Sequence, residues 1–190
     1  PIAGVRRRGL SSLGLNLEVE ENGATFEENA RLKAEAYCQA AGLPTLADDS
    51  GLVVDALDGA PGIYSARYAP GGDADRYRKL LEALAGVPAE QRTSRFRCVI
   101  ALAEPGGTVV TAEGSVEGVV GYGPRGEGGF GYDPVFLMPA LGLTMAELPS
   151  ALKDRVSHRA RAAYRIRPAL RRLIETGSLA DEPGCRRGSR

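Results

Sequence analysis

Two β-rich segments joined by a short turn constrain the fold of this chain more than any other feature. Residues 95–103 and 108–120 are rich in Val, Ala and Thr, and the four residues between them are Glu-Pro-Gly-Gly. Extended segments separated by a turn of Pro and Gly are typical of a β-hairpin. The chain must therefore contain a sheet, and the remaining segments decide what packs on it.

Three segments predict helices. Residues 25–28, Thr-Phe-Glu-Glu, have the form of a capping box, in which a hydroxyl is followed three residues later by a carboxylate, and they open a helix that extends to about residue 41. A second helix is predicted over 73–84. A third is predicted over 158–176, where the preceding serine can cap the first turn. Pro168 lies inside this third segment and is expected to kink or break the helix.

Shorter segments complete the expected sheet. Residues 43–47 and 52–57 predict strands, and Asp48-Asp49-Ser50-Gly51 predicts a turn that places acidic groups at a strand end. A hairpin and isolated strands mixed with helices favour one α/β or α+β domain with a mixed sheet over residues 1–190. Residues 1–15 are predicted to be a loosely ordered lead-in, and residues 177–190 a frayed tail.

Composition excludes several classes of protein. No apolar run approaches the roughly 20 residues that a membrane span needs, and no export signal is recognisable, so we expect a cytoplasmic protein without a membrane partner. Three widely spaced cysteines and one histidine predict neither a zinc site nor a disulfide framework. Residues 153–190 hold 11 Lys and Arg against 4 Asp and Glu. Such a basic end could bind nucleic acid, but no basic-aromatic RNA motif accompanies it, and we expect no nucleic-acid partner.

Adjacent acidic residues suggest a metal-dependent hydrolytic site. Carboxylates at Asp48 and Asp49 can hold Mg²⁺ while one of them orients or deprotonates a water, and hydrolysis of a phosphoanhydride needs both functions. An isolated Asp-Asp-Ser-Gly is more often a turn whose side chains bond nearby backbone. Glu20 and Glu21 can complete the metal site only if the fold brings them to Asp49.

Other candidates lie in the second half of the chain. The glycine-rich segment 126–133 lets backbone amides approach a ligand, and Phe130 within it offers a ring for stacking on a base. Residues 157–159, Ser-His-Arg, with Lys153 nearby, can present an imidazole, a guanidinium and free amides to an anion or a keto-bearing base. Each pattern also occurs without such a function, as a mobile loop or a solvated helix start.

Taken in order, these motifs resemble one known family, the inosine triphosphatases, which are pyrophosphatases for non-standard purine nucleoside triphosphates. The similarity extends from about residue 20 to about residue 174, and five ordered motifs make it specific. They are Thr25-Phe26-Glu27-Glu28-Asn29-Ala30 with Lys33-Ala34, Ala47-Asp48-Asp49-Ser50-Gly51-Leu52, Gly59-Ala60-Pro61-Gly62-Ile63-Tyr64-Ser65-Ala66-Arg67-Tyr68, Phe130-Gly131-Tyr132-Asp133-Pro134-Val135-Phe136 and Ser157-His158-Arg159.

The resemblance implies a fold, a reaction and a set of site residues. The fold is a two-lobed α/β domain around a long mixed β-sheet with a central cleft, and the assembly is a homodimer. The reaction is the Mg²⁺-dependent cleavage of ITP, dITP or XTP to the monophosphate and pyrophosphate. Asp49 is implied as proton acceptor and metal ligand, with Glu20, or else Glu21, as the second carboxylate. The implied substrate contacts are Lys33, Ser50, Arg67, Phe130, Gly131, Tyr132, Asp133, Lys153, His158 and Arg159, of which the last three would read the 6-keto oxygen of the base that adenine lacks.

One segment of the family pattern is not found. The family begins with a hydrophobic strand that leads into a Thr/Ser-x-Asn-x-x-Lys turn and binds the triphosphate, and residues 1–17 do not match it. The chain is therefore expected to start after this segment and to bind phosphates less well. Two alternatives stay open: a catalytically weak relative that keeps the base pocket, and a nucleic-acid-binding module that uses the arginine-rich end.

Overall fold

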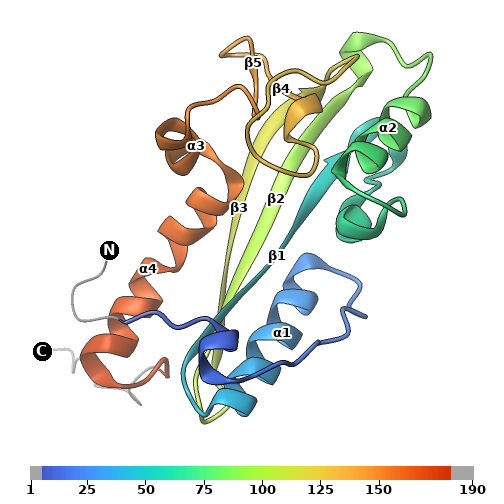
Figure 1. The fold of residues 1–190 in the computed structure, drawn as a ribbon. Helices are drawn as coiled ribbons and strands as arrows, with labels where there is room; N and C mark the ends of the chain where they lie inside the picture. The colour runs from blue at the N-terminus through green and yellow to red at the C-terminus, as the bar shows by residue number, and fades with distance from the viewer. Residues whose placement is uncertain (1–5, 181–190) are drawn as a thin grey trace, which may run out of the picture.

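The computed structural model describes residues 6–180 and is built on one five-stranded sheet (Figure 1). Its strands are β1 (Thr45–Val54), β2 (Thr93–Ala103), β3 (Val109–Val120), β4 (Phe136–Met138) and β5 (Leu143–Thr144). The strands lie in sequence order across the sheet, and β2 and β3 pair along their whole length. The predicted hairpin is confirmed.

All strand pairs among residues 6–180 are antiparallel, whereas a mixed sheet was expected. The α/β class is confirmed, because helices pack on the sheet from both sides. The difference has a topological cause. Each strand pairs with its neighbour in sequence, and parallel pairing would require a crossover that returns the chain to the same end of the sheet.

Four α-helices accompany the described sheet. They are α1 (Phe26–Ala41), α2 (Asp73–Ala83), α3 (Ser150–Val156) and α4 (His158–Thr176). The predicted cap of α1 forms, since the Thr25 hydroxyl accepts a hydrogen bond from the Glu28 amide at 3.1 Å. The Glu28 carboxylate reaches back to the amide of Ala24, at 2.6 Å, one residue earlier than in the standard capping box.

Proline does not interrupt α4. The helix continues through Pro168 to Thr176, so the expected break is wrong. The helix packs along β2 and β3, with Ile166 buried against Leu102, and this packing offsets the hydrogen bond that proline removes.

Short 3-10 helices fill several connections. One of them, Asp133–Val135, directly precedes the strand that begins at Phe136. The others are Leu10–Leu13, Asp55–Leu57, Gly62–Arg67 and Ala89–Gln91. Leu10–Leu13 is the one helical element that the structure describes between residues 6 and 17, and this stretch contains no strand.

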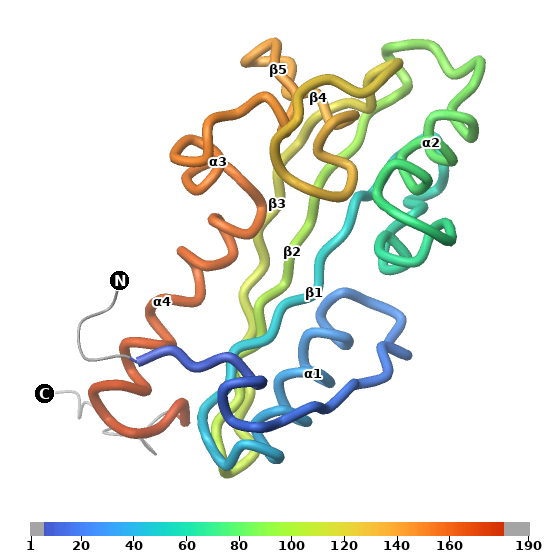
Figure 2. The backbone as a smooth tube through the Cα atoms, in the orientation of Figure 1, coloured from blue at the N-terminus to red at the C-terminus, as the bar shows by residue number. Residues whose placement is uncertain are grey.

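A different helix covers each face of the sheet at its lower end in Figure 1. Ala30 and Ala34 of α1 pack on Val99 of β2, on what we term the α1 face. On the opposite side, the α4 face, Ile166 packs on Leu102. Figure 2 shows the elements in two groups along the sheet, α1 and α4 around one end and α2 with β4 and β5 around the other, in agreement with the expected two lobes.

β1 runs through residues 48–51 without interruption, so the predicted acidic turn is wrong. Asp49 lies opposite Val99, and β2 supplies partners along the whole of β1. Backbone pairing with β2 therefore outweighs the local preference of Asp, Ser and Gly for turns. Because side chains alternate along a strand, Asp49 points to the α1 face, whereas Asp48 and Ser50 point to the α4 face.

The amino end of α4 lies unusually close to β3. A Cβ atom at Gly114 of β3 would collide with the backbone of His158 and Ala162, and it would lie 2.9 Å from the Cβ atom of Arg161. Only glycine fits at this point of the sheet. The backbone of β3 thus sets how near the first turns of α4 come to the α4 face.

The described carboxyl end is fixed to the sheet. Leu179 is buried, and its amide donates to the Glu104 carboxylate at 2.8 Å. The Ser178 hydroxyl also donates to Glu104, at 3.2 Å. The expected fraying is therefore wrong as far as Ala180, while residues 1–5 of the predicted lead-in and 181–190 of the predicted tail lie outside the described residues. Within the described chain, no helix has the length and apolar composition that crossing a membrane takes.

Candidate active site

Three charged side chains meet on the α1 face beside the middle of β1. The Lys33 ammonium of α1 lies 2.9 Å from an Asp49 carboxylate oxygen and 2.6 Å from a Glu21 carboxylate oxygen. Asp49 is 7% exposed. The structure therefore brings Lys33 and Asp49, two of the expected site residues, together with Glu21 from the segment that precedes α1. We term these three residues the carboxylate cluster.

Asn29, one turn before Lys33 on α1, ties the carboxylate cluster together. Its buried side-chain amide group donates to Asp49 at 3.4 Å, and its side-chain oxygen accepts from the Gly23 amide at 2.9 Å. A Cβ atom at position 23 would lie 2.8 Å from that same oxygen, so glycine is needed for this contact. The segment that carries Glu21 is thus attached to Asp49 through one side chain.

Burial sets the protonation properties of this cluster. It raises the pKa of the Asp49 carboxyl group above its usual value, and the Lys33 ammonium and the Asn29 amide offset only part of that effect. Burial disfavours charge on Lys33 as well, but its pairs with Glu21 and Asp49 outweigh burial and leave the Lys33 pKa raised. Lys33 is therefore charged at neutral pH, and Asp49 has the increased proton affinity that suits a general base.

The donor set of the carboxylate cluster fits a divalent cation that prefers oxygen. Asp49 and Glu21 converge on one point, which the Lys33 ammonium holds. Mg²⁺ usually takes one or two carboxylates and completes its shell with water and phosphate oxygens. Residues 6–180 contain no group of three or more His, Cys, Asp or Glu that could hold a metal ion. Glu20, expected as the second carboxylate, is exposed, and Glu21, the open alternative, occupies this place.

Arg67 lies beside Glu21. Its guanidinium donates to the backbone carbonyl oxygen of Glu21 at 3.1 Å and is 3.9 Å from the Glu21 carboxylate. The same guanidinium lies over the Tyr64 ring, 5.1 Å from the centroid. The expected substrate residue Arg67 thus adds a second cation to the α1 face.

Asp48 and Ser50 bind one arginine on the opposite face. Arg159 donates from Nε to the Asp48 carboxylate at 3.2 Å, and from a terminal nitrogen to the Ser50 hydroxyl at 2.8 Å. Asp48 therefore does not share a metal with Asp49, and the hypothesis of two adjacent aspartate ligands is wrong. Alternation along β1 is the reason, because adjacent residues of a strand face opposite ways.

Two cations flank the ring of Phe130, which is 56% exposed. The guanidinium carbon of Arg159 lies 4.9 Å from the ring centroid, and the Lys153 ammonium lies 5.2 Å from it. Lys153 also pairs with the buried Asp133, which accepts a hydrogen bond from the Phe130 amide at 3.0 Å. The structure thus gathers these four expected residues around an exposed aromatic surface, which we term the ring cluster.

Gly131 and Tyr132, also expected to contact substrate, bond to other parts of the chain. The Gly131 amide donates to the carboxylate of Asp73 at 2.6 Å. Tyr132 is buried, and its hydroxyl donates to the backbone carbonyl oxygen of Ser65 at 2.9 Å. Both contacts fix the loop that carries Phe130.

His158, the first residue of α4, is buried next to the ring cluster. Its ring stacks on Phe96 at a centroid distance of 4.7 Å, and the residue is 6% exposed. Burial lowers the pKa of His158 to about 3, with smaller contributions from the charges of Arg159 and Lys153. Nδ1 is buried and has no hydrogen-bond partner among the described residues. His158 is therefore neutral at physiological pH and keeps one donor and one acceptor nitrogen.

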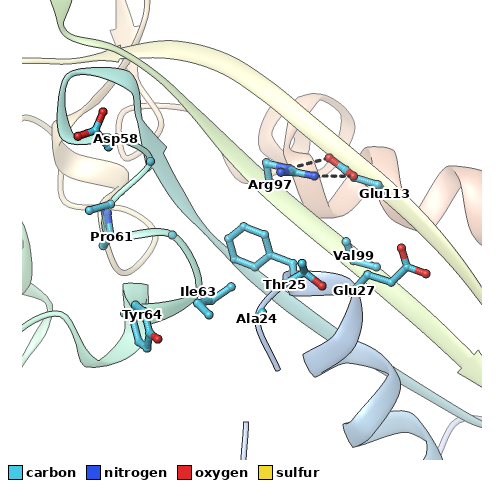
Figure 3. Close-up of a pocket in the computed structure, with 14 residues that line it drawn as sticks. Ala24, Thr25, Glu27, Asp58, Pro61, Ile63, Tyr64, Arg97, Val99 and Glu113 are labelled. Carbon is cyan, nitrogen blue, oxygen red and sulfur yellow. Dashed lines mark hydrogen bonds and ion pairs between the residues drawn. The ribbon is translucent and has the colours of Figure 1, made fainter. Parts of the chain in front are cut away.

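A hollow of about 660 Å³ lies on the α1 face, between the start of α1 and the loop 58–64 (Figure 3). Arg97 and Glu113 line it from the sheet and form a bidentate pair with both N–O distances at 2.8 Å. Neither Asp49 nor Lys33 lines this hollow. The hollow lies between the start of α1 and the loop 58–64, and it is separate from the carboxylate cluster.

Comparison with known protein families identifies the family of this chain. A sequence profile described as the Ham1 family matches residues 3–169, a range that includes every residue of both clusters. This chain belongs to the Ham1 family. The resemblance drawn from the ordered motifs is thereby confirmed.

Two similar members of the Ham1 family are named dITP/XTP pyrophosphatase, and a third has a solved structure. The dITP/XTP pyrophosphatase of Geobacter sulfurreducens is 58% identical over 147 residues, which cover 76% of this chain and 74% of that protein. The protein of the same name from Geobacillus kaustophilus is 54% identical over 151 residues, covering 78% and 74%. The Staphylococcus aureus Ham1 structure superposes with a TM-score of 0.81 at 44% identity, covering 86% of this chain and 85% of that one. The fold class is thus confirmed by structures as well as by sequence.

Two residues of this Ham1 site, Asn29 and Asp73, had not been assigned from sequence, and Asp48 had been given a different role. Asn29 had a usable signal, because it lies one turn from Lys33 on α1, beside the apolar face that contains Phe26 and Ala30. Asp48 had been considered as a metal ligand next to Asp49, because residues 48–51 were predicted to form a turn, but it binds Arg159 instead. Asp73 had no local signal, because its contact with Gly131 joins segments 58 residues apart.

Proposed function

We propose that this chain hydrolyses non-standard purine nucleoside triphosphates, namely dITP, XTP and ITP, to the monophosphate and pyrophosphate, with Mg²⁺ as cofactor. It is a nucleoside triphosphate pyrophosphatase, as its Ham1 relatives are named. The observation that carries the proposal is the pair of clusters on either side of β1. One holds carboxylates with an ammonium group, and the other holds an exposed ring with two cations close to it.

One nucleotide can reach both clusters because β1 is an edge strand of the described sheet. Beyond β1, the structure of residues 6–180 has one isolated bridge, between Val53 and Pro61. A nucleotide that crosses this edge near residues 48–51 would place its base on the Phe130 ring and its phosphates beside Lys33. The alternation that separates the clusters thus gives the base and the triphosphate different faces of one strand.

The carboxylate cluster supports attack by water on the α-phosphorus. Asp49 accepts a proton from the water, the water oxygen bonds to phosphorus, and the bond to the leaving pyrophosphate oxygen breaks. Lys33 and Arg67 offset the negative charge on the phosphate oxygens, where preorganised cations act most strongly in a partly buried site. Mg²⁺ held by Asp49 and Glu21 would supply further positive charge at the same oxygens.

The ring cluster supports selection of the base. Arg159 and Lys153 are obligate donors, and neutral His158 retains one N–H group. The 6-keto oxygen of hypoxanthine or xanthine accepts from such donors, whereas the 6-amino group of adenine does not. Each buried donor left unpaired costs about 1–3 kcal/mol, so adenine nucleotides are disfavoured without a separate editing step.

The homodimer that the resemblance implies is also part of this proposal. Light scattering coupled to size exclusion tests it on the full chain. A mass of one protomer at all concentrations used in the enzyme assays would remove the dimer from the proposal, and would leave the reaction untouched.

The deciding experiment measures pyrophosphate release from dITP, XTP, ITP and ATP by the full chain, with Mg²⁺ and with a chelator, beside an Asp49→Asn variant. We expect release from the first three substrates, little from ATP, and loss of release with the chelator or the substitution. Equal turnover of ATP and ITP, or an active Asp49→Asn variant, would contradict the proposal. Binding of IMP without any turnover would instead favour the catalytically weak relative.

A further inference from the structure

We infer that Asp73, the first residue of α2, is a positioning residue that holds the loop carrying Phe130 in the conformation that binds the base. The inference rests on the proposed function. It extends the site to α2, a helix that contributes none of the residues in either cluster.

Both carboxylate oxygens of Asp73 are engaged. Oδ2 accepts a hydrogen bond from the Gly131 amide at 2.6 Å, and Oδ1 pairs with the Arg76 guanidinium at 2.6 Å. Arg76 also donates to the backbone carbonyl oxygen of Gly71 at 3.2 Å, just before the helix. The carboxylate is thus held in orientation by α2 itself, and it reaches out to a loop that is remote in sequence.

The loop needs such an anchor because of its composition. Gly126, Gly129 and Gly131 all have positive φ, at 82°, 81° and 62°. A glycine-rich segment has many alternative conformations of similar energy, so contacts from outside decide which one is populated. The Phe130 ring cannot act as that contact, because it is more than half exposed.

Two hydrogen bonds fix the peptide groups on either side of the Phe130 side chain. Asp133 accepts from the Phe130 amide at 3.0 Å and lies within the same loop. Asp73 accepts from the next amide, that of Gly131, and lies outside the loop. Asp133 shapes the loop and pairs with Lys153 of α3, whereas Asp73 attaches the next peptide group to α2. The two contacts together set where the ring lies relative to Arg159 and Lys153.

A purely structural role for Asp73 at the start of α2 can be separated from this one. The amide before the helix, that of Gly72, donates to Asp75 at 2.9 Å, and Asp75 also pairs with Arg78 at 3.0 Å. Asp75 therefore satisfies the helix start but has no contact with the loop among the described hydrogen bonds. Asp75→Ala is a matched control, because it weakens the same helix end and leaves the bond to Gly131 in place.

Kinetics on the full chain test the inference. We expect Asp73→Ala to raise KM for ITP about tenfold with kcat nearly unchanged, since base stacking acts alike on bound substrate and transition state. Asp73→Asn should restore most of the affinity, because its side-chain oxygen still accepts from Gly131. Asp75→Ala should leave KM unchanged. In a Phe130→Ala background, Asp73→Ala should add no further increase in KM.

Amide hydrogen exchange gives a readout that needs no turnover, and it distinguishes failure of the inference from failure of the proposed function. Asp73→Ala should speed exchange in residues 126–133, and Asp75→Ala should not. If wild type turns over no purine nucleotide but exchange changes as stated, the proposed function fails and the anchor stands. The inference is overturned if exchange in the loop is unchanged, if Asp75→Ala reproduces the rise in KM, or if the effects of Asp73→Ala and Phe130→Ala on KM are additive.

Discussion

The carboxylate cluster and the ring cluster lie on opposite faces of the same strand, yet they differ in how they are held. In the carboxylate cluster, Asp49 and Lys33 are largely buried, and the neighbouring side chains pair with one another. In the ring cluster, Phe130 and Arg159 are open to solvent. The difference indicates that the groups for chemistry are ordered before substrate arrives, while the groups for recognition leave a surface that the base itself must cover.

Of all substitutions in the two clusters, Asp49→Asn should lower activity the most. Removing the proposed general base lowers kcat for ITP by about a thousandfold, within the range that such groups contribute. Thermal stability should not fall, because burial raises the pKa of Asp49 and a neutral amide is less costly to bury than a carboxylate. Steady-state kinetics and a thermal melt measure the two effects, and a variant that loses activity only by unfolding would leave the role of Asp49 without support.

Lys33→Met should come next. Without the ammonium, the carboxylates of Glu21 and Asp49 face each other with no cation between them, so we expect kcat/KM to fall about a hundredfold. The acidic limb of the pH–rate profile should move to higher pH, because Lys33 lowers the pKa of Asp49. Arg31→Met on the same helix is the control, since Arg31 pairs with the exposed Glu27 and not with the carboxylate cluster. Similar losses in both variants would point to α1 stability instead.

Asp48→Ala tests the other face of β1. It removes one of the two side chains of β1 that hold Arg159 and leaves Ser50 as the other, so discrimination between ITP and ATP should fall about tenfold, with a smaller change in kcat for ITP. Asp55→Ala, which removes a carboxylate paired with Arg95 just after β1, should leave discrimination unchanged. If Asp48→Ala instead abolished turnover of every nucleotide, the separation of chemistry and recognition between the two faces would be wrong.

The smallest effect concerns His158 and pH. Its pKa is about 3 in the folded chain against 6.5 for the free side chain, so the unfolded chain binds a proton that the folded chain does not between these values. Stability should therefore fall as pH decreases through this window, with His158 contributing a slope of up to about 1.4 kcal/mol per pH unit. Denaturant titrations should give a shallower slope for His158→Gln, and parallel slopes would show that the imidazole is protonated in the folded state.

Local signals were enough to predict α1, α2, α4 and the hairpin, whereas the short helix α3 was not predicted. Thr25 caps α1, Ser157 caps α4, and a Pro-Gly-Gly turn joins β2 to β3, so each element is specified by residues within it. β1 could not be predicted in this way. Its central residues favour turns, and the interaction that makes them a strand comes from β2, which lies far along the sequence.

The same limit applies to the site. The order of motifs pointed to Lys33, Asp49, Phe130 and Arg159, and the structure places each of them in a cluster. Their division between two faces depends on β1 being continuous, which the sequence did not indicate. The role of Asp73 could not be predicted for a related reason. Its partner is the backbone amide of Gly131, and the residue type at that position does not indicate what the amide bonds to.

Gly114 restricts how this site can be engineered, although it lies in neither cluster. It sets the distance between α4 and β3. Since any side chain there would push the first turns of α4 away from β3, it would also carry Arg159 away from Asp48 and Ser50. A mutant library intended to change which nucleobase is accepted should therefore vary Phe130 or Lys153 and keep position 114 fixed. Substitutions at Gly114 would be scored as losses of specificity even though their origin is the spacing between a helix and a strand.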